Sequence, residues 1–129
     1  MNNEEIKNKF DNKGFIKHNN IEIIDVEDNK ATLKAILTES SLNPYKIAHG
    51  GLIFGLGDTA MGVVAKLTGK NAVTLSSNIS YLKPATGSYL IAKAEMIKNG
   101  KTTCFLQANI YNEKNDLVAT MDANYFYIN

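Results

Sequence analysis

Residues 43–66 read NPYKIAHGGLIFGLGDTAMGVVAK, and this stretch determines how the rest of the chain is organised. It begins as a polar loop, passes through His49-Gly50-Gly51 and continues as an apolar segment long enough for a helix. A helix that is apolar on nearly every side is normally buried by other structure. Asp58 lies in the middle of this helix, where an ionisable side chain is costly unless it has partners or a function.

The remaining segments predict strands that wrap this helix. Alternating apolar residues and turn signals predict two strands before the helix and four after it. These strands cover residues 21–26, 31–37, 72–82, 89–98, 102–112 and 117–128. Because hairpins join successive strands, we expect an antiparallel sheet with the helix on one face, which is an α+β fold. A short helix over about residues 3–12 precedes these elements.

Two of the strand segments carry more specific predictions. Asn99-Gly100 predicts a tight hairpin turn in which both residues have positive φ. In residues 72–82, apolar side chains alternate with small, uncharged polar ones, which suits a polar face turned toward a site or a partner. The alternation puts Val73, Leu75, Ile79 and Tyr81 on one face and Thr74, Ser76, Asn78 and Ser80 on the other.

Composition excludes several functional classes. The 129 residues fit one domain covering the whole chain, 1–129, and a net charge of +1 gives no strong attraction to nucleic acid or to a membrane surface. No apolar run approaches the ~18 residues of a membrane span. Cys104 is the single cysteine, so we expect no internal disulfide and a reducing compartment, the cytoplasm. Two histidines and one cysteine without ligand spacing predict no metal site.

The central helix also predicts an oligomer. One concave sheet cannot cover a helix that is apolar all round, so part of the helix is expected to meet a second copy of the chain. The sequence therefore favours at least a homodimer.

His49-Gly50-Gly51 stands where the loop becomes the helix. The first N–H groups of a helix lack partners within the helix, and the helix dipole adds positive potential there. Glycine lets another group approach the backbone closely, so the position suits binding of a carbonyl that becomes an oxyanion. The same glycines would also permit a tight turn without any ligand, and His49 alone would be a hydrogen-bonded structural residue.

Asp58 is the second candidate. It follows Gly50 by eight residues, which is ~12 Å along a helix axis. A general base or nucleophile must lie within ~3 Å of its target or of one bridging water. Asp58 is therefore out of reach of a carbonyl at its own helix N-terminus but could serve one at an antiparallel partner helix. The alternative is a structural acid bonded to the backbone or to Thr59. Asn43 is either a turn residue before Pro44 or an amide donor to a substrate carbonyl.

These residues resemble a known family. Asn43 and His49-Gly50-Gly51, with Asp58 inside GLGDTAMG, resemble the hotdog-fold thioesterases of the phenylacetic-acid-degradation (PaaI-like) type. NISYLKPATG at 78–87 and KNGKTTCF at 98–105 are similar to two further blocks of that family, in the same order. The resemblance runs from about residue 15 to the end of the chain.

The resemblance implies a long helix wrapped by a curved antiparallel sheet, homodimers with shared active sites that often pair into homotetramers, and hydrolysis of an acyl-CoA thioester to free acid and CoA. It implies that Asp58 is the nucleophile or general base and that Gly50 N–H and the Asn43 amide bind the carbonyl. It also implies that Thr74 orients the acid or the water, and that His49 fixes the loop and contacts the thioester. CoA is part of the substrate, and no separate cofactor is implied. The residues matched to the substrate site are Gly51, Tyr81, Lys98, Asn99, Gly100, Lys101 and Thr102.

One position departs from the family pattern. The family usually has glycine three residues after the asparagine, where this chain has Lys46, so the loop that carries Asn43 could have a different conformation. Two alternatives to hydrolysis remain open. One is a non-catalytic acyl-CoA binding protein that uses the same cradle. The other is a hotdog dehydratase, which would need a histidine beside the acidic carbon of the substrate.

Overall fold

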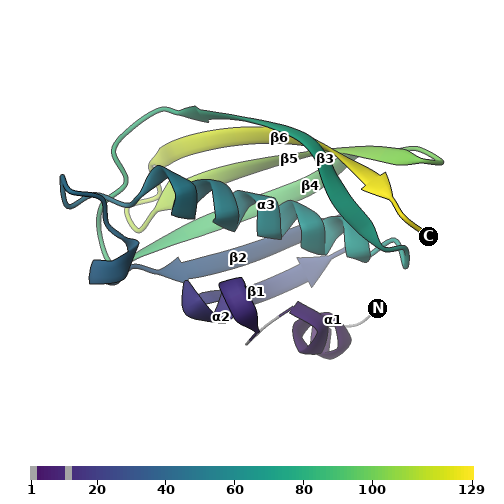
Figure 1. The fold of residues 1–129 in the computed structure, drawn as a ribbon, viewed down its shortest axis with the longest axis horizontal. Helices are drawn as coiled ribbons and strands as arrows, with labels where there is room; N and C mark the ends of the chain where they lie inside the picture. Colours follow the sequence, from purple (N-terminus) through teal and green to yellow (C-terminus); the bar gives the residue numbers. More distant parts are fainter. Residues whose placement is uncertain (1–2, 11–12) are drawn as a thin grey trace.

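The computed structural model describes residues 3–10 and 13–129 and shows one curved sheet that wraps a long central helix (Figure 1). The predicted α+β architecture, with two strands before this helix and four after it, is confirmed. Among the described residues, no helix has the length and apolarity needed to cross a membrane. The elements are α1 (Asn3–Phe10), α2 (Gly14–His18), β1 (Ile21–Glu27), β2 (Lys30–Ile36), the 3-10 helix η1 (Glu39–Ser41), α3 (Gly50–Lys66), β3 (Ala72–Tyr81), β4 (Tyr89–Asn99), β5 (Thr103–Asn112) and β6 (Leu117–Tyr127).

The sheet has six strands in the order β1-β2-β4-β5-β6-β3, and every neighbouring pair is antiparallel. β1 and β3 are therefore the two edges. The N-terminal helix ends at Phe10, and residues 11 and 12 of its predicted range lie outside the described residues. The five-residue helix α2 was not predicted, because a segment this short shows no helical period.

The core lies between α3 and the concave face of the sheet. Leu56, Met61 and Val64 of the helix are buried there, as are Leu106 and the free Cys104 of β5. At Gly57 the helix approaches the sheet so closely that an added Cβ would lie 2.1 Å from the Met121 sulfur. A glycine at this position lets helix and sheet pack at the short distance that the curved sheet requires.

The outward side of α3 is not covered within one chain. Gly51 is exposed, and Phe54, Asp58 and Gly62 are only partly buried. At Gly55, an added Cβ would lie 2.7 Å from the ring of Phe15, so α2 covers the helix at that point. Within one chain the helix thus keeps a face that is only partly covered, as the sequence predicts for an apolar helix packed against a single sheet.

A bulge in β3 changes the predicted faces of this strand. The pairing with β6 shifts between Thr74 and Ser76, which leaves Leu75 as the extra residue. Thr74 pairs with the buried Tyr125 and so faces the helix, on the same side as Ile79 and Tyr81. The predicted grouping of Val73 and Leu75 with Ile79 and Tyr81 is therefore wrong. Strict alternation fails because one unpaired residue reverses the phase of the strand.

The β4–β5 hairpin is present where Asn99-Gly100 predicts it, but its turn has a different geometry. Neither Asn99 nor Gly100 has positive φ, so the predicted two-residue turn is wrong. The loop runs from Gly100 to Thr102, and Gly100 N–H donates to the Thr103 carbonyl at 2.9 Å. A Cβ at Gly100 would lie 2.7 Å from that carbonyl oxygen. Glycine is thus required here by a close backbone contact.

Candidate active site

Asp58 is held by two hydroxyl groups that reach it from different strands. Its Oδ1 accepts a hydrogen bond from Thr74 Oγ1 at 2.7 Å and another from Tyr125 Oη at 2.7 Å. The Tyr125 hydroxyl also lies 2.6 Å from the Asp58 backbone carbonyl oxygen. Among the described residues, every hydrogen bond to this carboxylate ends on Oδ1, which leaves Oδ2 free for other contacts.

Tyr125 is a site residue that the sequence does not reveal. The alternation of residues along β6 correctly predicts that Tyr125 faces the core, where it is only 3% exposed. Burial, followed by the negative charge of Asp58, raises the pKa of the Tyr125 hydroxyl far above its ordinary value. The available signal is that a buried tyrosine hydroxyl needs a polar partner, and Asp58 is the acidic residue of the helix that crosses this strand.

The N-terminus of α3 leaves one backbone donor unused. His49 is the N-cap residue, and its Nδ1 accepts a hydrogen bond from Gly51 N–H at 2.8 Å. The N–H groups of Leu52 and Ile53 both donate to the His49 carbonyl. Gly50 N–H is the remaining donor of this turn and has no acceptor among the described residues. Because His49 Nδ1 is an acceptor, the ring proton of the neutral form lies on Nε2.

A cleft of about 380 Å³ opens beside this helix end. Tyr81 borders it and donates from Oη to the Gly50 carbonyl at 2.7 Å, and partial burial raises the pKa of the Tyr81 hydroxyl. The cleft thus has an apolar lining with a few polar groups near the free Gly50 N–H, which is typical of a small-molecule site. Its lining residues are Asn43, Ile47, Ala48, Gly50, Ile53, Tyr81, Leu82, Lys83, Pro84 and Ala85.

The Asn43 loop combines a turn residue with a free amide. Asn43 Oδ1 accepts hydrogen bonds from the N–H groups of Tyr45 and Ile47 at 2.9 and 3.4 Å, so it does form the predicted turn. Its Nδ2 group has no partner among the described residues and belongs to a side chain that lines the cleft. Lys46 has φ +63, a left-handed conformation that glycine adopts without strain. The loop therefore has the glycine-type conformation although it carries lysine.

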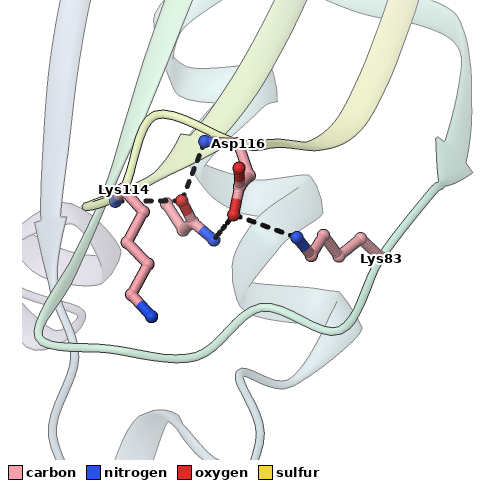
Figure 2. A network of polar contacts seen from close by, with 4 residues as sticks. Lys83, Lys114 and Asp116 are labelled. Atoms are coloured by element: carbon pink, nitrogen blue, oxygen red, sulfur yellow. Dashed lines mark hydrogen bonds and ion pairs between the residues drawn. The ribbon is translucent and has the colours of Figure 1, made fainter.

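The segment on the other side of the cleft is anchored by an ion pair (Figure 2). Lys83 Nζ lies 2.9 Å from Asp116 Oδ2, and Asn112 Nδ2 donates to the same oxygen at 3.2 Å. These hydrogen bonds, with that of Lys83 the stronger, lower the pKa of Asp116. Ala48 N–H in turn donates to the Ala85 carbonyl at 2.8 Å, which joins this segment to the loop before α3.

The predicted substrate residues 98–102 lie at the other end of α3. Lys70, just beyond the C-terminus of the helix, has its ammonium group 4.8 Å from the centre of the Tyr127 ring. The Tyr127 hydroxyl bonds Asn99, and its N–H donates to the Thr102 carbonyl. The β4–β5 hairpin is thus close to the C-terminal end of the helix (Figure 1). Within one chain, the structure brings Tyr81 and Asn43 to Gly50 and Thr74 to Asp58, but it does not bring the hairpin to either.

Sequence comparison identifies relatives with a stated activity. Residues 45–119 match the model of the thioesterase superfamily. The acyl-coenzyme A thioesterase PaaI of Escherichia coli K12 is 31% identical over 111 residues, which cover 85% of this chain and 79% of that protein. The structure of the E. coli PaaI protein from the phenylacetic acid degradation operon superposes with a TM-score of 0.89, over 95% of this chain and 89% of that one.

A second solved relative is a hypothetical thioesterase protein of Streptococcus pneumoniae TIGR4. It is 34% identical to this chain, with a TM-score of 0.80 over 84% of this chain and 89% of that one, and its structure contains coenzyme A. Two further structures of that protein carry alanine in place of an aspartate and in place of a threonine 16 positions later in that chain.

Proposed function

The chain belongs to the thioesterase superfamily, as a PaaI-like hotdog enzyme, and we propose that it hydrolyses acyl-CoA thioesters at two sites shared by the subunits of a homodimer. One observation carries the proposal. The helix α3 carries both a carboxylate held on one oxygen by two hydroxyls and an N-terminus with an unused N–H, and residues of the edge strand β3 bond to both places.

The distance between these two groups requires a second subunit. Gly50 and Asp58 are the first and ninth residues of α3, so ~12 Å of helix axis separates them. A carbonyl that accepts a hydrogen bond from Gly50 N–H is therefore out of reach of Asp58 in the same chain. If two copies place their α3 helices antiparallel about a two-fold axis, Gly50 of each copy approaches Asp58 of the other, which creates two equivalent sites.

The chemistry then follows from the groups present. The thioester oxygen accepts a hydrogen bond from Gly50 N–H, and the Asn43 amide is positioned to add a second one. Negative charge develops on this oxygen, where fixed donors and the helix dipole stabilise it. In one route, Asp58 Oδ2 removes a proton from a water molecule whose oxygen attacks the carbonyl carbon. In the other, Oδ2 attacks first and forms an anhydride that water then hydrolyses. In both routes the C–S bond breaks, and CoA leaves as the thiol after protonation.

The remaining site residues have supporting roles in this proposal. His49 fixes the loop through its cap, and its Nε2–H points outward from an exposed side chain as a further donor for the thioester. Tyr81 and Gly51 border the entrance for the pantetheine arm. The hairpin of residues 98–102 lies at the C-terminal end of α3, so in an antiparallel dimer it is expected to contact the CoA held at the partner's Gly50.

The relatives support the same assignment. PaaI of E. coli is an acyl-CoA thioesterase, and the streptococcal thioesterase binds coenzyme A. The aspartate and threonine replaced in that thioesterase are 16 positions apart, as are Asp58 and Thr74 in this chain. This equal spacing is the reason to give Thr74 a role in orienting the acid.

Thiol release from a panel of aromatic, short and long acyl-CoAs tests the proposal. The wild-type protein is expected to release CoA, and Asp58→Asn to lose at least ~100-fold in kcat because the reaction loses its base or nucleophile. Asp122→Asn is the matched control, since Asp122 pairs with Asn78 across the outer face of the sheet.

The other outcomes point to the alternative functions. Tight acyl-CoA binding by the wild type without turnover of any chain length would identify a binding protein, and an enoyl product would identify a dehydratase. Sedimentation of both variants must show the wild-type assembly, so that lost turnover is not lost folding. The same measurement determines whether dimers pair into the tetramer that the family resemblance predicts.

A further inference from the structure

Tyr125 makes the most direct connection between the sheet and the proposed catalytic acid. A phenol hydroxyl has one hydrogen to donate. The Tyr125 hydroxyl lies 2.7 Å from Asp58 Oδ1 and 2.6 Å from the Asp58 carbonyl oxygen. The single hydrogen is therefore shared between the side chain and the backbone of one residue. This contact fixes the carboxylate relative to the helix that carries it.

We propose that Tyr125 is a positioning residue for hydrolysis, which keeps Asp58 Oδ1 engaged so that Oδ2 alone faces the substrate. The inference rests on the proposed function of Asp58. Thr74 holds the same oxygen from the exposed edge strand, whereas Tyr125 is buried in β6. Two donors that converge from neighbouring strands on one oxygen restrict rotation of the carboxylate far more than either donor alone.

The surroundings of Tyr125 suit a permanent donor. Burial and the negative charge of Asp58 both raise the pKa of its hydroxyl, so the phenol stays protonated wherever the enzyme works. Gly62, one turn beyond Asp58, lies against the ring, and an added Cβ there would be in ordinary contact at 3.7 Å. The Tyr125 ring therefore passes close beneath the helix on its way to Asp58, although the spacing would also admit a small side chain at Gly62.

The test is Tyr125→Phe, which removes the hydroxyl and keeps the ring that packs in the core. A lost hydrogen bond to a charged group predicts a fall of about 10- to 100-fold in kcat with KM nearly unchanged. Tyr111→Phe is the control, because Tyr111 lies in β5 on the face of the sheet away from α3, with its ring 5.4 Å from the Lys93 ammonium group. Its kcat is expected to stay within about twofold of wild type.

Further variants separate positioning from a structural role. In Thr74→Ala with Tyr125→Phe, we expect a loss smaller than the product of the single losses, because removing either hydroxyl already frees the carboxylate to rotate. A Tyr125→Phe enzyme that melts at a lower temperature but keeps the wild-type kcat would overturn the proposal.

A crystal structure of Tyr125→Phe gives a readout that needs no activity. Rotation of the Asp58 carboxylate, or more than one orientation of it, is expected, and an unchanged single orientation would also overturn the proposal. If the wild type hydrolyses no acyl-CoA, the proposed function fails, while these coordinates still decide whether Tyr125 orients Asp58.

Discussion

The two edge strands of the sheet, β1 and β3, differ in the features that control whether an edge pairs with another chain. β1 is seven residues long, reads IEIIDVE with three acids, and has α2 packed against it. β3 has ten residues, AVTLSSNISY, and carries no charge. Natural sheets protect their edges with charge, short strands or a covering element. β1 has charged residues and a covering helix, and β3 has neither.

The unprotected edge is also the one beside the site. Thr74 and Tyr81 belong to β3, and they bond Asp58 and Gly50 of the helix above it. The open edge and the candidate site therefore lie side by side. This coincidence is the physical basis for expecting a second copy to pair along β3 and to complete both sites.

The largest effect is expected from a charge on the open edge. Leu75 and Ile24 are a matched pair, since each is the extra residue of a bulge in an edge strand, with exposed fractions of 61% and 46%. Leu75→Lys is expected to raise the dimer dissociation constant by roughly 100-fold or more, because two like charges approach across the two-fold axis. Activity is then lost with the dimer. Ile24→Lys should change neither the dimer dissociation constant, measured by sedimentation, nor the activity, measured by thiol release.

A monomeric Leu75→Lys protein with full activity would show that the sites are complete within one chain. Dissociation caused by Ile24→Lys would instead move the interface to β1.

A smaller effect is expected from the β3 hydroxyl that reaches the acid. Thr74→Ala removes one of the two donors to Asp58 Oδ1, so kcat should fall about tenfold, the cost of one hydrogen bond to a charged group. Thr74→Ser keeps the hydroxyl and is expected to retain most of the activity. Equal losses in both variants would mean that the threonine methyl group matters and the hydrogen bond does not.

On the β1 side of α3, a change should affect stability and not turnover. Phe15 of α2 rests on Gly55, and its ring is 56% exposed. Phe15→Ala is expected to lower the free energy of unfolding by about 1 kcal/mol, since only part of the ring area is buried. Urea unfolding measures this loss, and kcat should not change. A large fall in kcat would mean that Phe15 belongs to the active site, and would contradict the expectation that only the β3 side of the molecule affects turnover.

The smallest effect is expected in the loop at the cleft. Lys46 has φ +63, a conformation that costs a non-glycine residue about 1–2 kcal/mol. Lys46→Gly removes this strain but adds chain entropy to the unfolded state, which offsets about half of the gain. We expect a rise of about 0.5 kcal/mol in unfolding free energy with activity retained. A loss of activity would show that the lysine side chain, and not only the loop shape, serves the substrate.

Local patterns predict most of the fold because the strands alternate and the central helix is a long apolar run. Alternation in β5 places Cys104 and Leu106 correctly in the core, and helical rise alone separates Gly50 from Asp58. The failures lie where one residue breaks a pattern. The bulge at Leu75 reversed the faces of β3, and a three-residue loop replaced the turn expected at Asn99-Gly100.

The candidate site is predictable only where a residue type is unusual for its setting. An acid in an apolar helix is unusual and so indicates a candidate site residue, whereas the sequence around Tyr125 predicts only an ordinary aromatic residue of the core. Its contact with Asp58 spans 67 positions of sequence and depends on how β6 crosses beneath α3. Local periodicity contains no information about such a crossing. The left-handed conformation of Lys46 was equally hidden, because lysine gives no signal for positive φ.

Subunit complementation tests the central claim most directly, namely that Gly50 of one chain works with Asp58 of the other. Asp58→Asn removes the acid. Gly50→Pro removes the N–H at the first helical position, which proline often occupies, and His49 already has the extended ψ of 136 that a following proline favours. The new Cβ would lie 3.1 Å from Tyr81 Oη, so the Tyr81 side chain must shift by a few tenths of an ångström. The two variants are co-expressed with different tags, and the heterodimer is purified.

Each parent homodimer should be inactive. In the heterodimer one site has both defects and the other has neither, so we predict about half of the wild-type thiol release per dimer, because a two-fold dimer has two equivalent sites. A heterodimer as inactive as its parents would contradict the account, since it would mean that each chain supplies both groups to its own site.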